Sequence, residues 1–362
     1  MPAPAKTPDP AKTSRTSSVT SRPLVIGHRG ACGYVPEHTL TSYFIAMQAG
    51  VDFVEPDLVM SRDGVLIARH ENEISATTDV AAHPQFAARR TTRIIDGVSH
   101  TGWFTEDFTL AELKTLRARE RIPQVRPANV RFDGQFEIPT MDEILELLRA
   151  VQEQRTAAAQ AAGRTPPVRI GVYPETKHPS YFAARNLAME RTLVDTLHRH
   201  GYQGPDGAAF IQCFEVGNLK AMRGMTELPI VQLMEDEGAP YDLQACGDPR
   251  TYRDMCTPTG LAEIATYANA IGPHKLQVIA LTADQAALAE PTRLVRDAHA
   301  AGLKVHAYTF RAENRFLPGN LRAPGTEFGD LQAELHAYLS AGLDGFFTDH
   351  PDIGVRARDA AL

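Results

Sequence analysis

The chain has 362 residues, of which 43% are apolar and 22% charged, and its formal net charge is −7. This is the composition of an ordinary globular protein, and it excludes collagen-like and wholly disordered chains. The acidic balance argues against nucleic acid as the main partner, because phosphate backbones bind basic faces. No stretch approaches the ~18 consecutive apolar residues of a membrane-spanning helix, so we expect no stable membrane insertion.

Residues 1–20 consist mostly of Ala, Pro, Ser, Thr and Lys. Such a segment buries too little apolar surface to offset its ordering entropy, so we expect a disordered leader. It lacks the apolar stretch of a signal peptide. Residues 21–362 are expected to form a single domain. Cys246 and Cys256 could close a disulfide or remain two thiols, and no oligomeric state is predicted.

Short apolar segments alternate with longer amphipathic ones along the chain. The expected strands cover residues 24–28, 52–57, 65–70, 169–175, 208–214, 229–234, about 268–272, 304–310 and 344–348. Capping-box patterns at Thr109/Glu112 and Thr140/Glu143 predict the starts of two helices. A glycine separates a helical pattern from the following strand at four places, residues 50, 201, 302 and 342. Repeated βα units of this kind indicate a parallel sheet covered by helices.

The number of strands distinguishes a barrel from an open sheet. Asp63-Gly64 is a hairpin signal, so the segment 65–70 should run antiparallel to the strand before it. Eight parallel strands remain, which predicts a (βα)8 TIM barrel, an α/β fold. An open doubly wound sheet is the alternative, but no Gly-x-Gly-x-x-Gly turn follows the first strand. We interpret residues 79–139 and 235–259 as long loop insertions at the C-terminal mouth of the barrel.

Several predicted strands end in polar residues. These strand-end residues are His28, Arg29, Glu55, Asp57, His70, Glu175 and Lys177. Active sites of barrels lie at the C-terminal ends of the strands, so we expect these side chains to lie at one mouth. If Asp63-Gly64 is a two-residue turn, Asp57 lies opposite His70, and both share a face with Glu55.

The chemistry of this set points to a phosphodiester. Glu55, Asp57 and Glu175 would repel one another unless they held protons or a hard divalent cation such as Ca²⁺ or Mg²⁺. Arg29 and Lys177 beside a cation call for an anion, most naturally phosphate. His28 and His70 could act as general acid and general base. Taken singly, each residue is more often structural, but four polar strand ends at one rim are hard to ascribe to chance.

The motifs occur in a specific order along residues 24–353. They are His28-Arg29-Gly30, Pro36-Glu37-His38-Thr39, Glu55-Pro56-Asp57, His70-Glu71, Glu175-Thr176-Lys177 and Phe347-Thr348-Asp349-His350-Pro351. The ordered set resembles the glycerophosphodiester phosphodiesterase family. The variant Pro-Glu-His-Thr and the long insertions resemble its larger, periplasmic-type bacterial branch.

The resemblance implies a TIM barrel that hydrolyses glycerophosphodiesters, such as glycerophosphocholine or glycerophosphoethanolamine, to sn-glycerol 3-phosphate and an alcohol. It implies His28 and His70 as acid and base, Glu55, Asp57 and Glu175 as metal ligands, Arg29 and Lys177 on phosphate, and Glu37 as a support for the first loop. Ca²⁺ is favoured, with Mg²⁺ as the alternative. The implied location is the periplasm or the exterior, with the cytoplasm as the alternative.

One departure from the family pattern concerns the seventh strand. Tyr308-Thr309-Phe310-Arg311 stands where many members have Trp-Thr-x-Asn. We expect Arg311 to point to solvent, and Tyr308 and Phe347 to be apolar walls or barrel filling. Two other functions stay open: a lysophospholipase D-like activity on lipids, and a non-catalytic binding protein on the same fold. The attacking group, water or the glycerol hydroxyl, also stays open.

Overall fold

The computed structural model describes residues 22–325 and 327–362. The expected leader, residues 1–20, lies outside the described residues. Among the described residues, no helix is long and apolar enough to cross a membrane. All four cysteines, including Cys246 and Cys256, are free thiols.

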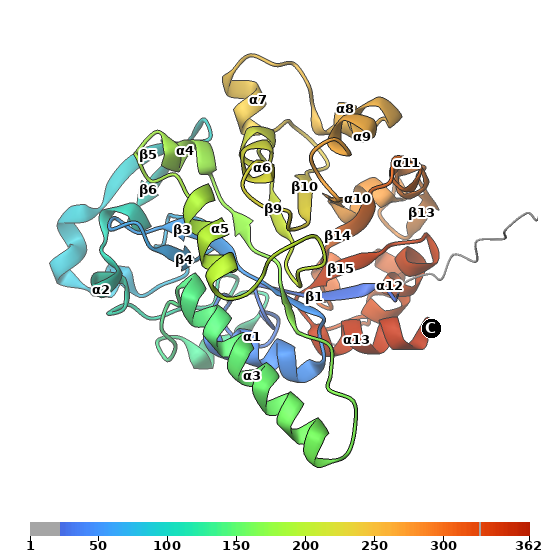
Figure 1. The fold of residues 1–362 in the computed structure, drawn as a ribbon, viewed down its shortest axis with the longest axis horizontal. Helices are drawn as coiled ribbons and strands as arrows, with labels where there is room; N and C mark the ends of the chain where they lie inside the picture. The colour runs from blue at the N-terminus through green and yellow to red at the C-terminus, as the bar shows by residue number, and fades with distance from the viewer. Residues whose placement is uncertain (1–21, 326) are drawn as a thin grey trace, which may run out of the picture.

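A ring of parallel strands forms the centre of the structure (Figure 1). Its strands are β1 (Leu24–His28), β2 (Phe53–Glu55), β3 (Asp57–Met60), β7 (Gly171–Val172), β8 (Glu175–Thr176), β9 (Ile211–Cys213), β10 (Ile230–Met234), β11 (Ala270–Pro273), β14 (Lys304–Phe310) and β15 (Gly345–Thr348). Within the described residues the sheet order is β4-β3-β8-β9-β10-β11-β14-β15-β1-β2-β7. β2 and β3 are separated by Pro56 alone, and β7 and β8 by two residues.

β2 and β3 are two parts of one interrupted strand, and β7 and β8 are two parts of its neighbour. The two strands pair along both parts, β2 with β7 and β3 with β8, and this pairing joins the two ends of the sheet order. Hydrogen bonds continue across both interruptions: Tyr173 N donates to Val54 O at 2.9 Å, and Glu175 N donates to Pro56 O at 2.9 Å. The sheet therefore closes, and the predicted (βα)8 TIM barrel is confirmed.

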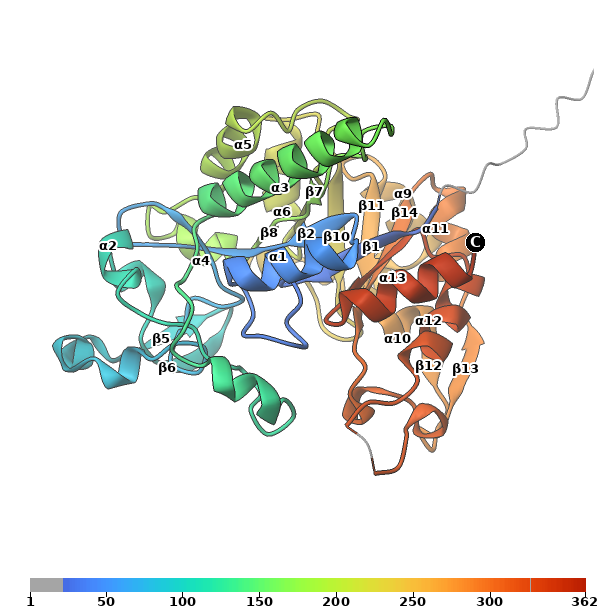
Figure 2. The same ribbon diagram turned by 90° about the horizontal axis from the view of Figure 1, so that it is seen from below.

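Helices surround the ring, as Figures 1 and 2 show. They are α1 (Leu40–Ala49), α2 (Leu110–Leu113), α3 (Met141–Ala161), α4 (Pro179–Ala183), α5 (Glu190–Arg199), α6 (Val216–Arg223), α7 (Tyr241–Ala245), α8 (Tyr252–Met255), α9 (Pro258–Ile264), α10 (Lys275–Val278), α11 (Leu294–Ala300), α12 (Leu331–Ser340) and α13 (Pro351–Ala360). Both predicted capping boxes form, at the starts of α2 and α3. Gly50 ends α1 with φ +93°, the left-handed conformation that allows the chain to turn at once into β2.

The register predicted for the hairpin is wrong by one residue. β3 and β4 (Leu66–Ala68) are antiparallel, but Leu58 pairs with Ala68 and Met60 with Leu66. Arg69, not His70, therefore lies opposite Asp57, and Arg69 N donates to Asp57 O at 3.0 Å. The cause is a three-residue loop: only Gly64 has a positive φ, whereas a two-residue Asp-Gly turn needs it at both positions.

Two further hairpins lie outside the barrel. β5 (Thr91–Ile95) and β6 (Val98–Gly102) belong to the insertion 79–139, which extends away from the strands in Figure 2. β12 (Ile279–Leu281) and β13 (Leu288–Pro291) follow α10. Neither hairpin was expected.

The interior of the barrel is filled by one apolar or aromatic side chain from nearly every strand. These side chains are Ile26, Phe53, Tyr173, Phe210, Val231, Ala270 and Phe347. β14 contributes His306 instead, and its Nδ1 lies 2.8 Å from the Tyr173 hydroxyl. This tightly packed, mostly apolar layer closes the barrel below the mouth.

Candidate active site

The candidate site lies one step above the apolar layer. Side chains two residues apart on a strand point to the same side, so the next inward positions after the layer face the mouth. Those positions line a cavity of about 360 Å³ and include His28, Glu55, Glu175, Gln212, Leu233 and Tyr308. Arg29, Asp57, His70 and Lys177 line the same cavity. The structure therefore brings the seven strand-end residues together.

Three buried carboxylates form the floor of the cavity. Glu55, Asp57 and Glu175 are each at most 6% exposed, and one oxygen from each lies within 4.8 Å of the others. Burial and the charges of Asp57 and Glu175 raise the pKa of Glu55 well above its usual range. Burial, offset in part by Lys177, raises the pKa of Glu175 to about 8. Although burial acts in the opposite direction, Lys177 and His38 hold the pKa of Asp57 well below its usual range.

This arrangement fits a hard divalent cation. Carboxylate oxygens are the donors that Ca²⁺ and Mg²⁺ prefer, and no thiolate or imidazole nitrogen is part of the group. The raised pKa values of Glu55 and Glu175 express the mutual repulsion that a cation would relieve. The buried Gln212 side chain, whose Oε1 has no hydrogen-bond partner, lines the same cavity.

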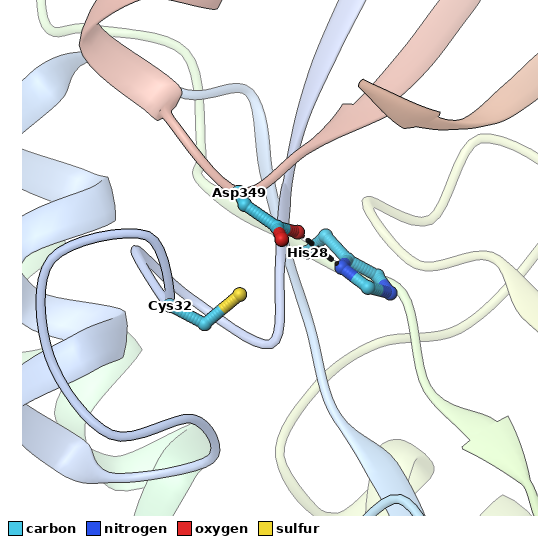
Figure 3. Close-up of side chains that lie close together, drawn as sticks. All are labelled: His28, Cys32 and Asp349. Atoms are coloured by element: carbon cyan, nitrogen blue, oxygen red, sulfur yellow. Dashed lines mark hydrogen bonds and ion pairs between the residues drawn. The ribbon is translucent and has the colours of Figure 1, made fainter. Parts of the chain in front are cut away.

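His28 is held by Asp349 at the end of β15 (Figure 3). Its Nδ1 lies 2.6 Å from Asp349 Oδ1, so a proton on Nδ1 donates to the carboxylate and Nε2 is left with its lone pair. Asp349 also forms ion pairs with Arg126 and Arg311. Burial, together with the charge of Arg29, lowers the pKa of His28 to about 4.

Cys32 lies beside this pair in Figure 3, and its sulfur is close to both residues. Burial raises the pKa of the Cys32 thiol well above its usual value. The guanidinium of Arg126, which donates to Cys32 O at 2.9 Å and pairs with Asp349, supplies the positive charge at this point. The thiol thus fills a tight turn, and the group does not suit a cation.

His70 is oriented in the same way as His28. Its Nδ1 lies 2.5 Å from Glu71 Oε2, and Glu71 in turn pairs with Arg121 at 2.7 Å. Arg121 also donates two hydrogen bonds to Glu37, at 2.8 and 2.6 Å. Desolvation and the charges of Arg29 and Lys177 lower the pKa of His70 well below its usual value. Arg121 belongs to the insertion 79–139, so this insertion helps to orient His70.

Two cations face the carboxylates. Arg29 Nη1 donates to Glu37 at 2.8 Å, and Arg29 Nε lies 3.3 Å from Asp57. Lys177 Nζ lies 2.8 Å from Glu175 and 3.9 Å from Asp57. Glu37 is 4% exposed and forms ion pairs with both Arg29 and Arg121. These two ion pairs fix the loop after β1.

Several residues of the site lie elsewhere than predicted or have no predicted role. Arg311 does not point to solvent: it lines the cavity and donates through Nε to Asp349 at 2.8 Å. His38 has no predicted role of its own within its motif, yet its Nε2 lies 2.9 Å from Asp57. Asp349 directly follows the last strand, β15, and a polar residue at a strand end is the signal that could have identified it as a site residue. Arg121 and Arg126 come from the irregular insertion and carried no such signal.

The fold and the cavity define a class: an α/β-barrel protein with a carboxylate cluster that could hold a metal ion, flanked by imidazoles and cations. The sequence comparison gives the family. Residues 28–353 match the Glycerophosphoryl diester phosphodiesterase family, so the chain belongs to this family of hydrolases.

Similar proteins cover the whole barrel. The chain is 35% identical to the glycerophosphodiester phosphodiesterase GDPD6 of Arabidopsis thaliana, over 91% of this chain and 84% of the relative. It is 27% identical to a glycerophosphodiester phosphodiesterase of Haemophilus influenzae, over 94% and 90%. A solved Oleispira antarctica phosphodiesterase, in complex with the product sn-glycerol-3-phosphate, shares the fold with a TM-score of 0.57 and 21% identity, over 93% and 97%. The expected bacterial branch stays a prediction.

Proposed function

We propose that the chain hydrolyses glycerophosphodiesters to sn-glycerol 3-phosphate and an alcohol, with a divalent cation bound by Glu55, Asp57 and Glu175. One observation carries the proposal: three buried carboxylates and two imidazoles, each imidazole fixed through Nδ1 by its own carboxylate, line one cavity of about 360 Å³. Family membership supports it, as does the product named for the Oleispira protein.

The cation, when bound, would neutralise the charge of the carboxylates and of the phosphate. It would thereby stabilise the negative charge on phosphate in the transition state. We propose Ca²⁺, with Mg²⁺ as the alternative. Arg29 and Lys177 lie on either side of Asp57 and are placed to bind the phosphate oxygens. Glu37 keeps Arg29 in this position through the 2.8 Å hydrogen bond to Nη1.

His28 and His70 supply the proton transfers. In both rings Nδ1 faces a carboxylate, so Nε2 is the nitrogen that exchanges a proton with the substrate. Their lowered pKa values keep both rings neutral at pH 7 in the free site, ready to accept a proton from the attacking group. The negative charge of a bound diester raises the pKa of a neighbouring imidazole, which allows the second ring to protonate the leaving alcohol.

The location expected from the resemblance, periplasmic or secreted, stays part of the proposal, with the cytoplasm as the alternative.

The test is the release of glycerol 3-phosphate from glycerophosphocholine by the metal-depleted chain with Ca²⁺ or Mg²⁺ added back. The expected result is release with the metal and none without it. No release with either ion, by a folded chain that still binds the ion, would overturn the proposal. Lysophosphatidylcholine serves as the comparison substrate and should be cleaved poorly.

A further inference from the structure

A second cavity of about 300 Å³ adjoins the candidate active site. The two cavities share Glu175, Lys177, Phe214 and Glu235 as lining residues. The walls of the second cavity come from the segments that follow β8, β9 and β10, so it opens at the same mouth. The insertion 235–259 supplies one side of it. A ligand held between Arg29 and Lys177 could therefore extend past Lys177 into this cavity.

Carboxyl groups outnumber cationic side chains in the lining of the second cavity. In addition to Glu175 it is lined by Asp96, Glu215, Glu235 and Glu237. Asp96 pairs with His178 at 2.6 Å, and Glu215 accepts hydrogen bonds from Ser180. Glu235 and Glu237 form no ion pair with any described residue from 22 to 325 or from 327 to 362. Two carboxylates therefore face the cavity without a cationic partner.

Aromatic rings form the rest of the wall. Phe214 and Tyr252 pack edge to face with ring centroids 6.2 Å apart, and Tyr241 lies beside them in the lining. Lys177 Nζ already lies 5.6 Å from the centroid of Phe214, which shows that this ring accepts a cation. Tyr252 is only 6% exposed and lines the cavity, so its ring is held in a fixed position in the wall. The cavity therefore offers aromatic faces next to its carboxylates.

We propose that this cavity binds the alcohol portion of the substrate and selects alcohols that carry an alkylammonium group. The inference rests on the proposed function, because it assumes that the phosphate lies between Arg29 and Lys177. One arm of the diester then occupies the first cavity, and the leaving alcohol extends into the second. Free carboxylates together with aromatic faces are the combination that recognises alkylammonium cations. Neutral alcohols gain none of these contacts.

The experiment compares kcat/KM for glycerophosphocholine with that for glycerophosphoglycerol. We expect a preference of at least about tenfold for the cationic substrate. Glu237→Lys reverses a charge that lines only the second cavity, and it should lower kcat/KM for glycerophosphocholine about fivefold while leaving glycerophosphoglycerol within twofold. Glu227→Lys makes the same change at an exposed carboxylate of a separate hollow, and should leave both values unchanged. Equal use of the two substrates, or equal losses in Glu237→Lys, would overturn the inference.

A binding measurement separates this inference from the proposed function. Choline is titrated into the wild-type chain by calorimetry, where turnover plays no part. Choline binding that Glu237→Lys weakens about fivefold supports the subsite even if no diester is hydrolysed. Hydrolysis without choline binding keeps the proposed function and overturns the subsite. Lysophosphatidylcholine distinguishes the source of the cation, because cleavage at a rate close to that of glycerophosphocholine would assign the cavity to a lipid headgroup.

Discussion

Replacing Asp349 by Asn should slow turnover much more than it disturbs the fold. Asp349 Oδ1 lies 2.6 Å from His28 Nδ1, and both side chains are buried. An amide keeps the size but loses the charge that fixes the tautomer of the ring and stabilises its protonated form. Correct general acid–base catalysis contributes about 10²–10⁴-fold, and we expect kcat to fall within this range while KM changes little.

The same substitution removes the charged partner of Arg311 and one of the two carboxylate partners of Arg126, which should cost about 3 kcal/mol of unfolding free energy. Glu313→Gln is the matched control, because Glu313 is 2% exposed and also pairs with Arg126, without contacting His28. Stopped assays at a temperature well below both melting points should find kcat near wild type for Glu313→Gln. A kcat for Asp349→Asn within threefold of wild type would show that Asp349 does not support His28 in catalysis.

Three further predictions concern single side chains. His70→Ala should lower kcat by about 10²–10⁴-fold while calorimetry finds unchanged metal affinity; near-normal turnover would remove His70 from catalysis. Glu55→Gln should weaken Ca²⁺ binding at least about tenfold, because a carboxylate ligand is lost. It should also raise the melting temperature of the metal-free chain, because it relieves the repulsion between the carboxylates. A lowered melting temperature would argue against that repulsion. Burial lowers the pKa of His306 from 6.5 to about 4, so the unfolded chain takes up the proton first and the unfolding free energy falls as the pH drops below 6.5. At pH 5 the wild-type chain should therefore lose about 2 kcal/mol more than His306→Gln in denaturant titrations, because the other buried histidines remain in both chains; equal losses in both would contradict it.

The barrel could be predicted because its signals are local. β1 and β14 begin and end at the expected residues, and both capping boxes form as predicted. Polar residues at the ends of apolar strands also predicted which side chains share the mouth, because all parallel strands of a barrel end on the same side. Period-two alternation then separates Phe53, in the apolar layer, from Glu55 above it.

The two Asp-Gly pairs illustrate why register is harder to predict. Asp96-Gly97 has positive φ at both residues and forms the two-residue turn between β5 and β6. In Asp63-Gly64 only Gly64 has a positive φ. Asp63 belongs to a longer loop, in which its Oδ1 accepts hydrogen bonds from Ser61 Oγ and Leu110 N. A contact with a residue 47 positions away therefore decides the turn, and it has no local signal. His70 reaches the cavity because the chain leaves β4 after Ala68, not through the expected pairing.

The supporting ion pairs could not be predicted for the same reason. Arg121 and Arg126 lie in an insertion without regular periodicity, yet they reach Glu37, Glu71 and Asp349. Their partners are 84, 50 and 223 residues away in sequence, and only the folded chain brings them together. Arg311 belongs to the same network, and this network draws it into the cavity.

The role of the metal is tested most directly by a joint titration of the metal-depleted chain with Ca²⁺, in which calorimetric occupancy and glycerol 3-phosphate release are followed in parallel. We expect one bound ion per chain and activity that rises in proportion to occupancy, and in Glu55→Gln both curves should shift to at least about tenfold higher Ca²⁺ concentration. Full activity before any ion is bound, or an ion that binds with unchanged affinity in Glu55→Gln, would contradict it.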